Sequence, residues 1–134
     1  MKEITISTLK RFELVDITNQ VRNIVAESKV KEGLCHVFCP HATAAISINE
    51  NSDENIEIDL MNFLNHFIPH GKWLHDSVDG NGDAHIKSNI IGSDKSIPIK
   101  DGKLLLGTWQ NINFCEFDGP RNDRRIIVTI IGKN

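Results

Sequence analysis

Hydrophobic residues recur at every second position in several short stretches of the chain. Residues 4–6 and 15–17 alternate between apolar and polar side chains, which is the spacing of strands with one buried face. Two further stretches, 34–38 and 44–48, are rich in apolar and β-branched residues and flank the sequence Pro-His-Ala-Thr at 40–43. Because proline cannot join a central ladder, we expect two strands here with a break between them.

A helical spacing of three and four residues separates some of these strands. Apolar residues between Thr18 and Gly33 share one face of a helix, for which Thr18 is the expected N-cap and Gly33 the stop. A second helix keeps the same spacing over residues 56–67, and Ser52 or Asp53 can cap it. Each helix therefore has an apolar face that can cover a sheet.

The second half of the chain begins with a long segment of little periodicity. Residues 68–83 are rich in Gly, Asp, Asn and His, and a loop of this length in a compact domain is more often functional than decorative. Residues 84–91 then predict a short helix, and an Asp-Gly pair between the apolar runs of 97–106 predicts a hairpin. Residues 107–118 and 124–131 are expected to form two long strands.

The length and composition fit one globular domain that spans residues 1–134. The chain is 40% hydrophobic and 25% charged, which is neither the bias of a disordered protein nor that of a membrane protein. Its first residues lack the apolar core of a signal peptide. We therefore expect a cytoplasmic protein of mixed α and β structure with no membrane partner.

Cysteine content and net charge narrow the possible partners. The chain has 3 cysteines, an odd number, without a CxxC pair, which argues against a disulfide framework and a zinc ribbon. We interpret Cys35, Cys39 and Cys115 as buried thiols that pack as small hydrophobic groups. A net charge of -3 gives no overall attraction to nucleic acid, so a small molecule is the expected partner.

Three of the 6 histidines lie in or beside predicted loop breaks: His41, His75 and His85. Imidazole is both a metal ligand and an acid or base near neutral pH. If the three converge, they suit a divalent ion or proton transfer, although their spacing matches no local zinc motif. The alternative is that they are ordinary hydrogen-bonded loop histidines.

Carboxylates, amides and arginines make up the remaining candidates. The run Asn49–Asn51 precedes the second helix, where it either meets a ligand or caps the helix. Gln110 and Glu116 would share a strand face with apolar residues, which indicates a half-buried pocket or a contact between subunits. Of the adjacent Arg124 and Arg125, only one can face a given pocket, and it is either a ligand for phosphate or a solvated surface residue.

Several of these residues occur in the order of a known family, and the chain resembles the YjbQ family over nearly its whole length. The matching positions are 40–45, 49–51, 59, 75–76, 84–88, 107–110, 116 and 124–125. The runs Ala-His-Ile-Lys-Ser at 84–88 and Gly-Thr-Trp-Gln at 107–110 are the most specific, because neither is a general signal of a fold. One position departs from the family, where a hydroxyl side chain commonly follows the motif histidine and this chain has Ala42.

The resemblance implies a compact α/β (α+β) sandwich of mostly antiparallel strands with two or three helices. It also implies a homotrimer, with family residues gathered near the subunit contacts, and a weak, secondary thiamine-phosphate synthase activity. Carried over position by position, the implied site consists of His41, Glu50, Asn51, His75, His85, Thr108, Gln110, Glu116 and Arg124. Among these, the substrate-binding group includes Asn51, Thr108 and Gln110.

The implied reaction joins hydroxymethylpyrimidine diphosphate to thiazole phosphate and releases pyrophosphate, so negative charge on the leaving oxygens needs cations. We assign Arg124 and Lys87 to the phosphates of these small metabolites. Glu116 or Glu50 would bind a magnesium ion, and the histidines would orient the pyrimidine or move protons.

Two other functions stay open at this point. His41, His75 and His85 could bind a divalent metal, with zinc as the first choice, that activates water, and Glu116 or Glu50 would be the base of a small-substrate hydrolase. Alternatively, the protein could bind a small anionic metabolite without converting it, in which case a ligand would stabilise the fold and no product would form.

Overall fold

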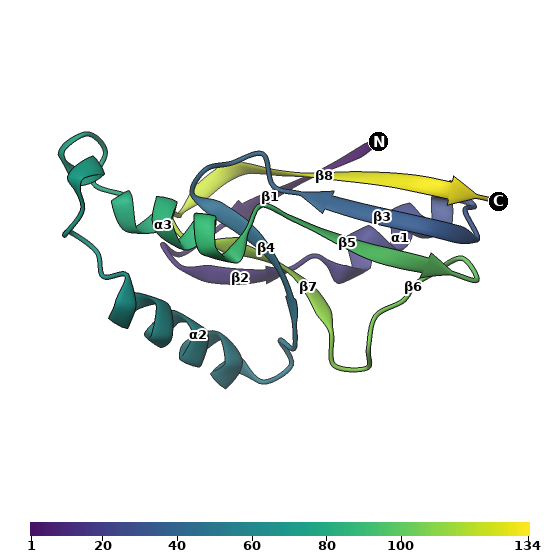
Figure 1. Ribbon diagram of the computed structural model, residues 1–134, viewed down its shortest axis with the longest axis horizontal. Coiled ribbons are helices and arrows are strands. Elements are labelled where there is room, and N and C mark those ends of the chain that lie inside the picture. The colour runs from purple at the N-terminus through teal and green to yellow at the C-terminus, as the bar shows by residue number, and fades with distance from the viewer.

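Two antiparallel sheets make up the centre of the computed structural model, which describes residues 1–134 (Figure 1). The 5-stranded sheet has the order β1-β8-β3-β5-β6, and the 3-stranded sheet has the order β2-β7-β4. The strands are β1 Lys2–Thr8, β2 Glu13–Asp16, β3 Glu32–Phe38, β4 Ala44–Asn49, β5 Asp94–Lys100, β6 Lys103–Leu104, β7 Asn111–Glu116 and β8 Arg121–Lys133. Every strand pairing is antiparallel.

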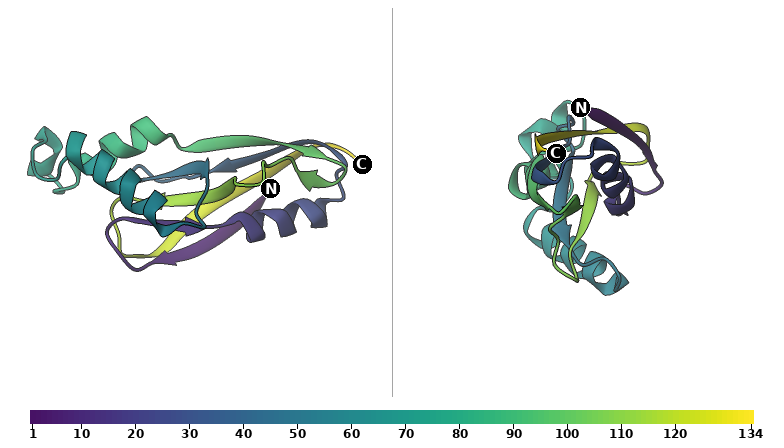
Figure 2. Two further views of the ribbon diagram at one scale, coloured as in Figure 1. Left: turned by 90° about the horizontal axis from the view of Figure 1, so that it is seen from below. Right: turned by 90° about the vertical axis from the view of Figure 1, so that its right-hand side faces the viewer.

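The helices lie outside the sheets. They are α1 Thr18–Ser28, α2 Glu54–Phe67, the 3₁₀ helix η1 Leu74–Ser77 and α3 Gly82–Ile91. α1 runs along one side of the sheets, whereas α2, η1 and α3 gather at the opposite end of the molecule (Figures 1 and 2). This arrangement confirms the predicted α+β sandwich of mostly antiparallel strands.

The two faces of β7 contribute to different hydrophobic clusters. Ile112 and Phe114 are fully buried in the larger cluster, which also draws on both sheets and α1. Cys115 and Phe117 face the other way and belong to a cluster with residues of α2 and α3, such as Leu64. Because side chains alternate along a strand, β7 is buried on both faces, and any polar residue on it needs a partner inside the protein.

Helix α1 begins and ends differently from the sequence prediction. Thr18 is its first helical residue rather than its N-cap, and the Thr18 hydroxyl donates to Asp16 Oδ1 at 2.6 Å and accepts from the Ile112 N–H at 2.8 Å. The helix ends at Lys29, which has the left-handed φ of 62°. Gly33 therefore does not stop the helix and lies within β3 instead.

The predicted strand 107–118 is the second difference. Only Asn111–Glu116 forms a strand, because the preceding residues make a turn in which the Gln110 N–H donates to the Gly107 carbonyl at 3.0 Å. Gln110 Oε1 also accepts from the Gly107 N–H at 2.8 Å, and such local side-chain bonds compete with a strand ladder. As a result Thr108 and Gln110 are exposed.

Several other sequence predictions are confirmed. Asp53 is the N-cap of α2 and accepts from the backbone two residues later, and residues 101–102 form the hairpin turn between β5 and β6. Cys35, Cys39 and Cys115 are free and buried, and burial raises the pKa of each thiol to about 11. The structure contains no helix whose length and apolar character would let it span a bilayer.

Candidate functional site

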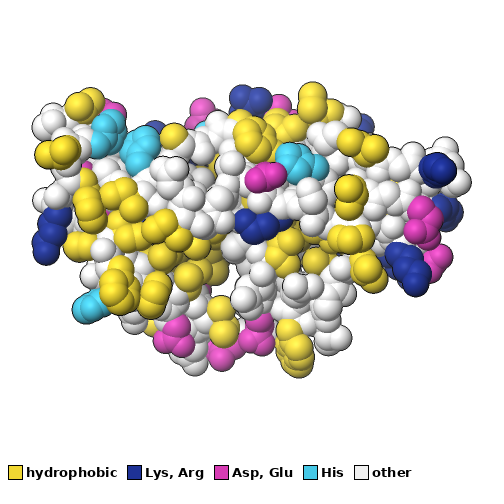
Figure 3. All heavy atoms as spheres, viewed as in Figure 1, with side chains coloured by type: hydrophobic (Ala, Val, Ile, Leu, Met, Phe, Trp, Pro, Cys, Tyr) yellow, Lys and Arg dark blue, Asp and Glu magenta, His cyan; other side chains and the backbone are white.

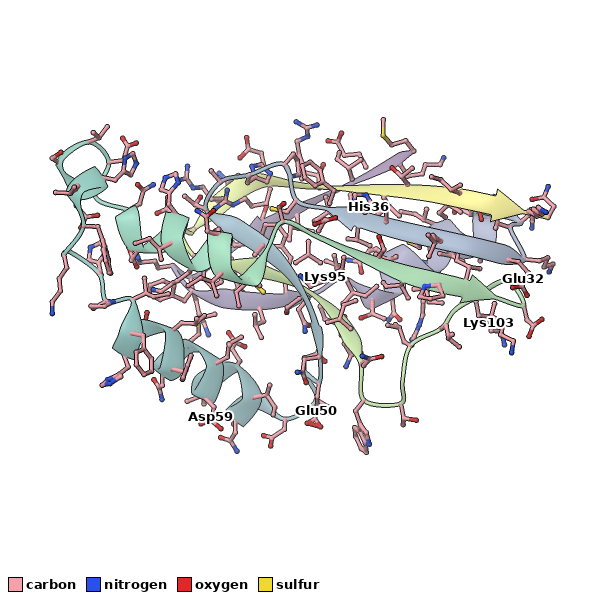
Figure 4. The ribbon with its side chains drawn as sticks, in the orientation of Figure 1. Glu32, His36, Glu50, Asp59, Lys95 and Lys103 are labelled. Carbon is pink, nitrogen blue, oxygen red and sulfur yellow. The ribbon has the colours of Figure 1, made fainter.

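The expected site residues separate into two groups at opposite ends of the paired strands β4 and β7. The strand register places Ala44 opposite Glu116 at one end of β4, where His41 precedes the strand, whereas Glu50 follows the other end (Figure 4). At about 3.3 Å per residue, β4 keeps the two ends roughly 20 Å apart. We call them the histidine end, with His41, His75, His85, Lys87, Glu116 and Arg124, and the amide end, with Glu50, Asn51, Thr108 and Gln110.

An ion pair between Glu116 and Arg124 lies inside the histidine end. Glu116 is 0% exposed and Arg124 is 5% exposed. Arg124 Nε donates to Glu116 Oε1 at 2.9 Å, and Arg124 Nη2 donates to Glu116 Oε2 and to Thr43 Oγ1. Glu116 also accepts from the Thr8 hydroxyl at 2.7 Å and from the Asp118 N–H at 3.2 Å. Both carboxylate oxygens therefore have two donors within the chain.

This pairing differs from the roles predicted for the two residues. The sequence assigns Arg124 to a phosphate and Glu116 to a metal or to general base catalysis, whereas the structure bonds each of them to the other. The neighbouring Arg125 faces outward, and its Nε lies 2.8 Å from Glu3 Oε1 at a half-exposed site. The prediction that only one of the two arginines faces the interior is therefore confirmed.

A second buried ion pair joins Lys87 and Asp83, one turn apart on α3. Both side chains are 0% exposed, and Lys87 Nζ lies 3.0 Å from Asp83 Oδ2. Lys87 Nζ also donates to Asn65 Oδ1 of α2 at 2.7 Å and lies 4.2 Å from the centre of the Phe12 ring. Burial lowers the pKa of the Lys87 ammonium, although Asp83 opposes the change. These groups enclose the ammonium. The sequence predicts that Lys87 binds a phosphate, whereas this geometry leaves the ammonium bonded within the protein.

Asp83 connects Lys87 to cations nearer the surface. Asp83 Oδ1 accepts from Arg11 Nη2 at 3.1 Å and lies 3.2 Å from His70 Nδ1. Burial alone would raise the pKa of Asp83, but the bonds from Lys87 and His70 and the charges of Lys87 and Arg11 bring it below its usual value. Arg11 Nη1 also lies 3.6 Å from Asp118 Oδ1, so Asp118 joins the two ion pairs into one network.

Two imidazoles face each other where η1 meets α3. The ring centroids of His75 and His85 lie 4.6 Å apart in an edge-to-face arrangement. His75 is exposed and His85 is half-buried, and histidine side chains are visible at this end of the surface beside a broad band of hydrophobic side chains (Figure 3). Asp76 fixes the turn before α3, because backbone N–H groups on both sides of η1 donate to its carboxylate and lower its pKa.

The α3 edge that carries His85 has polar atoms without a partner. Asn81 Oδ1 and Ser88 Oγ are buried and make no hydrogen bond, and residues 81, 85 and 88 share one helix face because they are four and three positions apart. Asn81 Nδ2 donates to Asp118 Oδ2 at 2.8 Å. Asn81, Asp83 and Asp118 have no local sequence signal other than the start of a helix or a turn.

His41 makes a contact of a different kind. Its Nε2 accepts the Arg125 backbone N–H at 2.8 Å, and burial, together with the charges of Arg124 and Arg125, lowers its pKa. His75 and His85 thus lie together, whereas His41 is bonded to β8. No group of three or more His, Cys, Asp or Glu side chains is arranged to hold a metal ion, so the residues of one chain do not fit a three-histidine metal centre.

The amide end is more open. Asn51 Nδ2 donates to Asn113 Oδ1 of β7 at 2.7 Å, which fixes the turn that follows β4. Glu50 is half-buried, and Thr108 and Gln110 are exposed. None of the hydrogen bonds made by these side chains reaches a residue of the histidine end, so one chain does not bring the two groups into a single pocket.

The fold and the site define a class of protein: an antiparallel α+β sandwich that carries an imidazole pair and two buried ion pairs. The family model described as "UPF0047 protein YjbQ-like" matches residues 2–133. The chain belongs to this family, which confirms the resemblance found in the sequence.

Relatives and solved structures agree with this assignment. The chain is 54% identical over 127 residues to the UPF0047 protein MJ1081 of Methanocaldococcus jannaschii, covering 95% of this chain and 91% of that protein. It is 40% identical over 121 residues to the UPF0047 protein YugU of Bacillus subtilis, covering 90% and 92% of the two chains. A YbjQ-like protein of unknown function from Sulfolobus solfataricus superposes with a TM-score of 0.95 at 42% identity, covering 98% of this chain and 96% of that one.

Proposed function

We propose that the protein binds a small phosphorylated metabolite at the histidine end and has a weak thiamine-phosphate synthase activity. The observation behind the proposal is the pair of His75 and His85, whose ring centroids lie 4.6 Å apart. The other charged residues of the histidine end are already bonded in two buried ion pairs. His75 is exposed and His85 is half-buried, and imidazole is the side chain that most often acts as a general acid or base. The family resemblance supplies the identity of the reaction.

The reaction replaces a carbon–oxygen bond by a carbon–nitrogen bond. The thiazole nitrogen attacks the methylene carbon of hydroxymethylpyrimidine diphosphate, and the electron pair of the broken bond leaves with pyrophosphate. Negative charge grows on the leaving oxygen, and a ring N–H of His75 or His85 can donate a hydrogen bond to it. The other ring can orient the pyrimidine.

The two buried ion pairs have a positioning role in this proposal. Glu116 and Arg124 hold β7, β8 and the loop before β4 together, and Lys87 holds α3 against α2. A reactive side chain needs such a rigid support to stay in a productive position. We therefore assign Arg124 and Lys87 to the support of the site rather than to direct phosphate binding.

A metal-dependent hydrolase is less well supported by the geometry. That function needs three ligands around one ion. His41 Nε2 already accepts the Arg125 N–H, and one chain has no group of three or more His, Cys, Asp or Glu side chains arranged to hold a metal ion.

We further propose that the protein forms a homotrimer in which the two ends of neighbouring copies meet. The length of β4 keeps the two ends of one chain roughly 20 Å apart, and a head-to-tail ring can bring the amide end of one copy to the histidine end of the next. Exposed apolar side chains on α2 and η1 support a contact surface, since Phe63, Phe67 and Leu74 are 60%, 63% and 97% exposed. Sedimentation should give three times the 15.1 kDa chain mass, and a monomer would contradict the composite site.

The synthase activity is tested by incubating purified protein with both substrates and measuring thiamine phosphate. We expect slow product formation by the wild type and a loss of about 10²-fold in His75→Asn and in His85→Asn. His66→Asn is the matched control, because His66 is exposed on α2 and makes no bond to the network. Full turnover in both variants, or no product from the wild type, would contradict the assignment. Thermal stabilisation by thiamine phosphate without any product would instead support binding alone.

A further inference from the structure

We propose that His41 contacts the bound ligand as a neutral hydrogen-bond donor, through its Nδ1–H, and selects a ligand oxygen that accepts a hydrogen bond. This inference rests on the proposed function, because it requires a ligand at the histidine end, and it adds one chemical feature of that ligand. A phosphate oxygen of the metabolite is such an acceptor.

The end of a strand pairing explains the contact on the other ring nitrogen. β3 pairs with β8 only as far as Phe38, opposite Ile127, and Pro40 follows without an N–H to continue the ladder. Arg125, two residues before Ile127, has no β3 carbonyl opposite its N–H, and His41 Nε2 accepts that N–H at 2.8 Å. A backbone N–H can only donate, so Nε2 must carry the lone pair.

The position of the ring proton follows from this bond. A neutral imidazole has one N–H and one lone pair, and because the lone pair of His41 is on Nε2, its proton is on Nδ1. Nδ1 has no hydrogen-bond partner in the chain, and it is not a fully buried atom. The half-buried ring therefore presents an N–H to its surroundings.

The surroundings of the ring keep it neutral. Burial lowers the pKa of His41, and the charges of Arg124 and Arg125 lower it further against the opposing effects of Asp123 and Glu116. Protonation would also place a ring N–H against the Arg125 N–H and remove the 2.8 Å bond. The donor on Nδ1 is thus present at neutral pH without a positive charge.

The loop that carries His41 is held at two points on β8. His41 accepts from the backbone of Arg125, and Thr43 accepts from the guanidinium of Arg124 at 3.0 Å. Two anchors on adjacent residues of one strand restrict the rotation of the ring, and a donor in a fixed position binds an acceptor without a further entropy cost. An amino group of a ligand has no acceptor at this position, which gives the site its selectivity for oxygen.

The tautomer is tested directly by proton-to-nitrogen correlation spectra of the imidazoles in ¹⁵N-labelled full-length protein. At pH 7 we expect a protonated Nδ1 and an unprotonated Nε2 for His41, and a shift of the Nδ1 resonance on addition of inorganic pyrophosphate. An Nε2–H tautomer, a charged ring, or a resonance that pyrophosphate leaves unchanged would overturn the inference. The tautomer is read without substrate, so it is independent of whether synthase turnover is found.

A pair of substitutions separates the two ring nitrogens. His41→Asn keeps an N–H donor near the position of Nδ1, and we expect its pyrophosphate affinity to stay within about threefold of the wild type. His41→Gln keeps an acceptor near the position of Nε2 and loses the Nδ1–H, so its affinity should fall about tenfold, the usual effect of one hydrogen bond. Equal affinity of His41→Gln and the wild type, with both folded by circular dichroism, would contradict the donor role.

Discussion

The charged residues of the histidine end are buried and ion-paired, whereas no residue of the amide end is buried. Glu116 and Lys87 are 0% exposed and each has a charged partner, while Thr108 lies in an open turn. Both ends contain residues of the same family pattern. A family residue can therefore stabilise the fold or meet a ligand, and burial and pairing distinguish the two roles where residue type does not.

The largest effect is expected from separating Glu116 and Arg124. In Glu116→Gln, the buried guanidinium of Arg124 loses its counter-charge, and the free energy of unfolding should fall by about 3–5 kcal/mol in urea denaturation. Glu3→Gln is the matched control, because it removes the partner of Arg125 at a site where the side chains are 49% and 44% exposed. The control should cost about 0–1 kcal/mol, and an equal effect of the two variants would contradict the distinction.

A smaller loss is expected at the second ion pair. Lys87→Met should reduce the free energy of unfolding by about 2 kcal/mol, because Asp83 keeps its bonds to Arg11 and His70. Lys103→Met, on the exposed strand β6, should change it by less than about 0.5 kcal/mol. Urea denaturation of the two variants checks the difference. An unchanged free energy of unfolding in Lys87→Met would show that the buried ammonium does not stabilise α3.

The same substitution at the two ends gives a third comparison. Thr43 is 7% exposed and its hydroxyl accepts from Arg124, so Thr43→Ala should cost about 1 kcal/mol of unfolding free energy. Thr108 makes no side-chain hydrogen bond in its exposed turn, and Thr108→Ala should be within about 0.5 kcal/mol of the wild type. Thermal unfolding of both proteins measures the contrast, which would be lost if Thr108→Ala were the more destabilising change.

The pH dependence of stability gives the smallest expected effect. The pKa of His41 is lower in the folded protein than in the unfolded chain, so the unfolded chain takes up a proton first as the pH falls. The contribution of His41 to stability is complete above about pH 6.5, the usual value for the unfolded chain, and is lost as the pH falls below it. The unfolding free energy of the wild type should therefore fall relative to that of His41→Gln as the pH drops below about 6.5, because the Gln acceptor does not titrate, and parallel pH profiles would contradict this origin.

The regular elements could be predicted from the sequence because burial repeats at a fixed period. Alternation predicts β1 and β2, the apolar and β-branched content predicts β3 and β4, and the helical spacing predicts the buried face of α2 with Leu64. The turn before β7 could not be predicted in this way, since it depends on one bond between Gln110 Oε1 and the Gly107 N–H. The end of α1 depends on the conformation of Lys29, a residue type that seldom adopts a positive φ.

The composition of the site could be predicted better than its pairing. His75 and His85 are 10 residues apart in the sequence and lie together because η1 and α3 are short and joined by a tight turn. The bonds of Arg124 to Thr43 and of Arg11 to Asp83 span 81 and 72 residues. No local pattern specifies which of many carboxylates and hydroxyls a distant cation meets, so the balanced charges of the network emerge only from the fold.

The most direct test of the central claim is a titration of the protein with inorganic pyrophosphate, followed through the ring protons of all 6 histidines. If a phosphorylated ligand binds at the histidine end, the resonances of His75 and His85 shift and saturate together. His36, which is bonded to Asp94 on β5, and His66 on α2 should not move. Saturating shifts at His36 or His66 with none at His75 and His85 would contradict the claim.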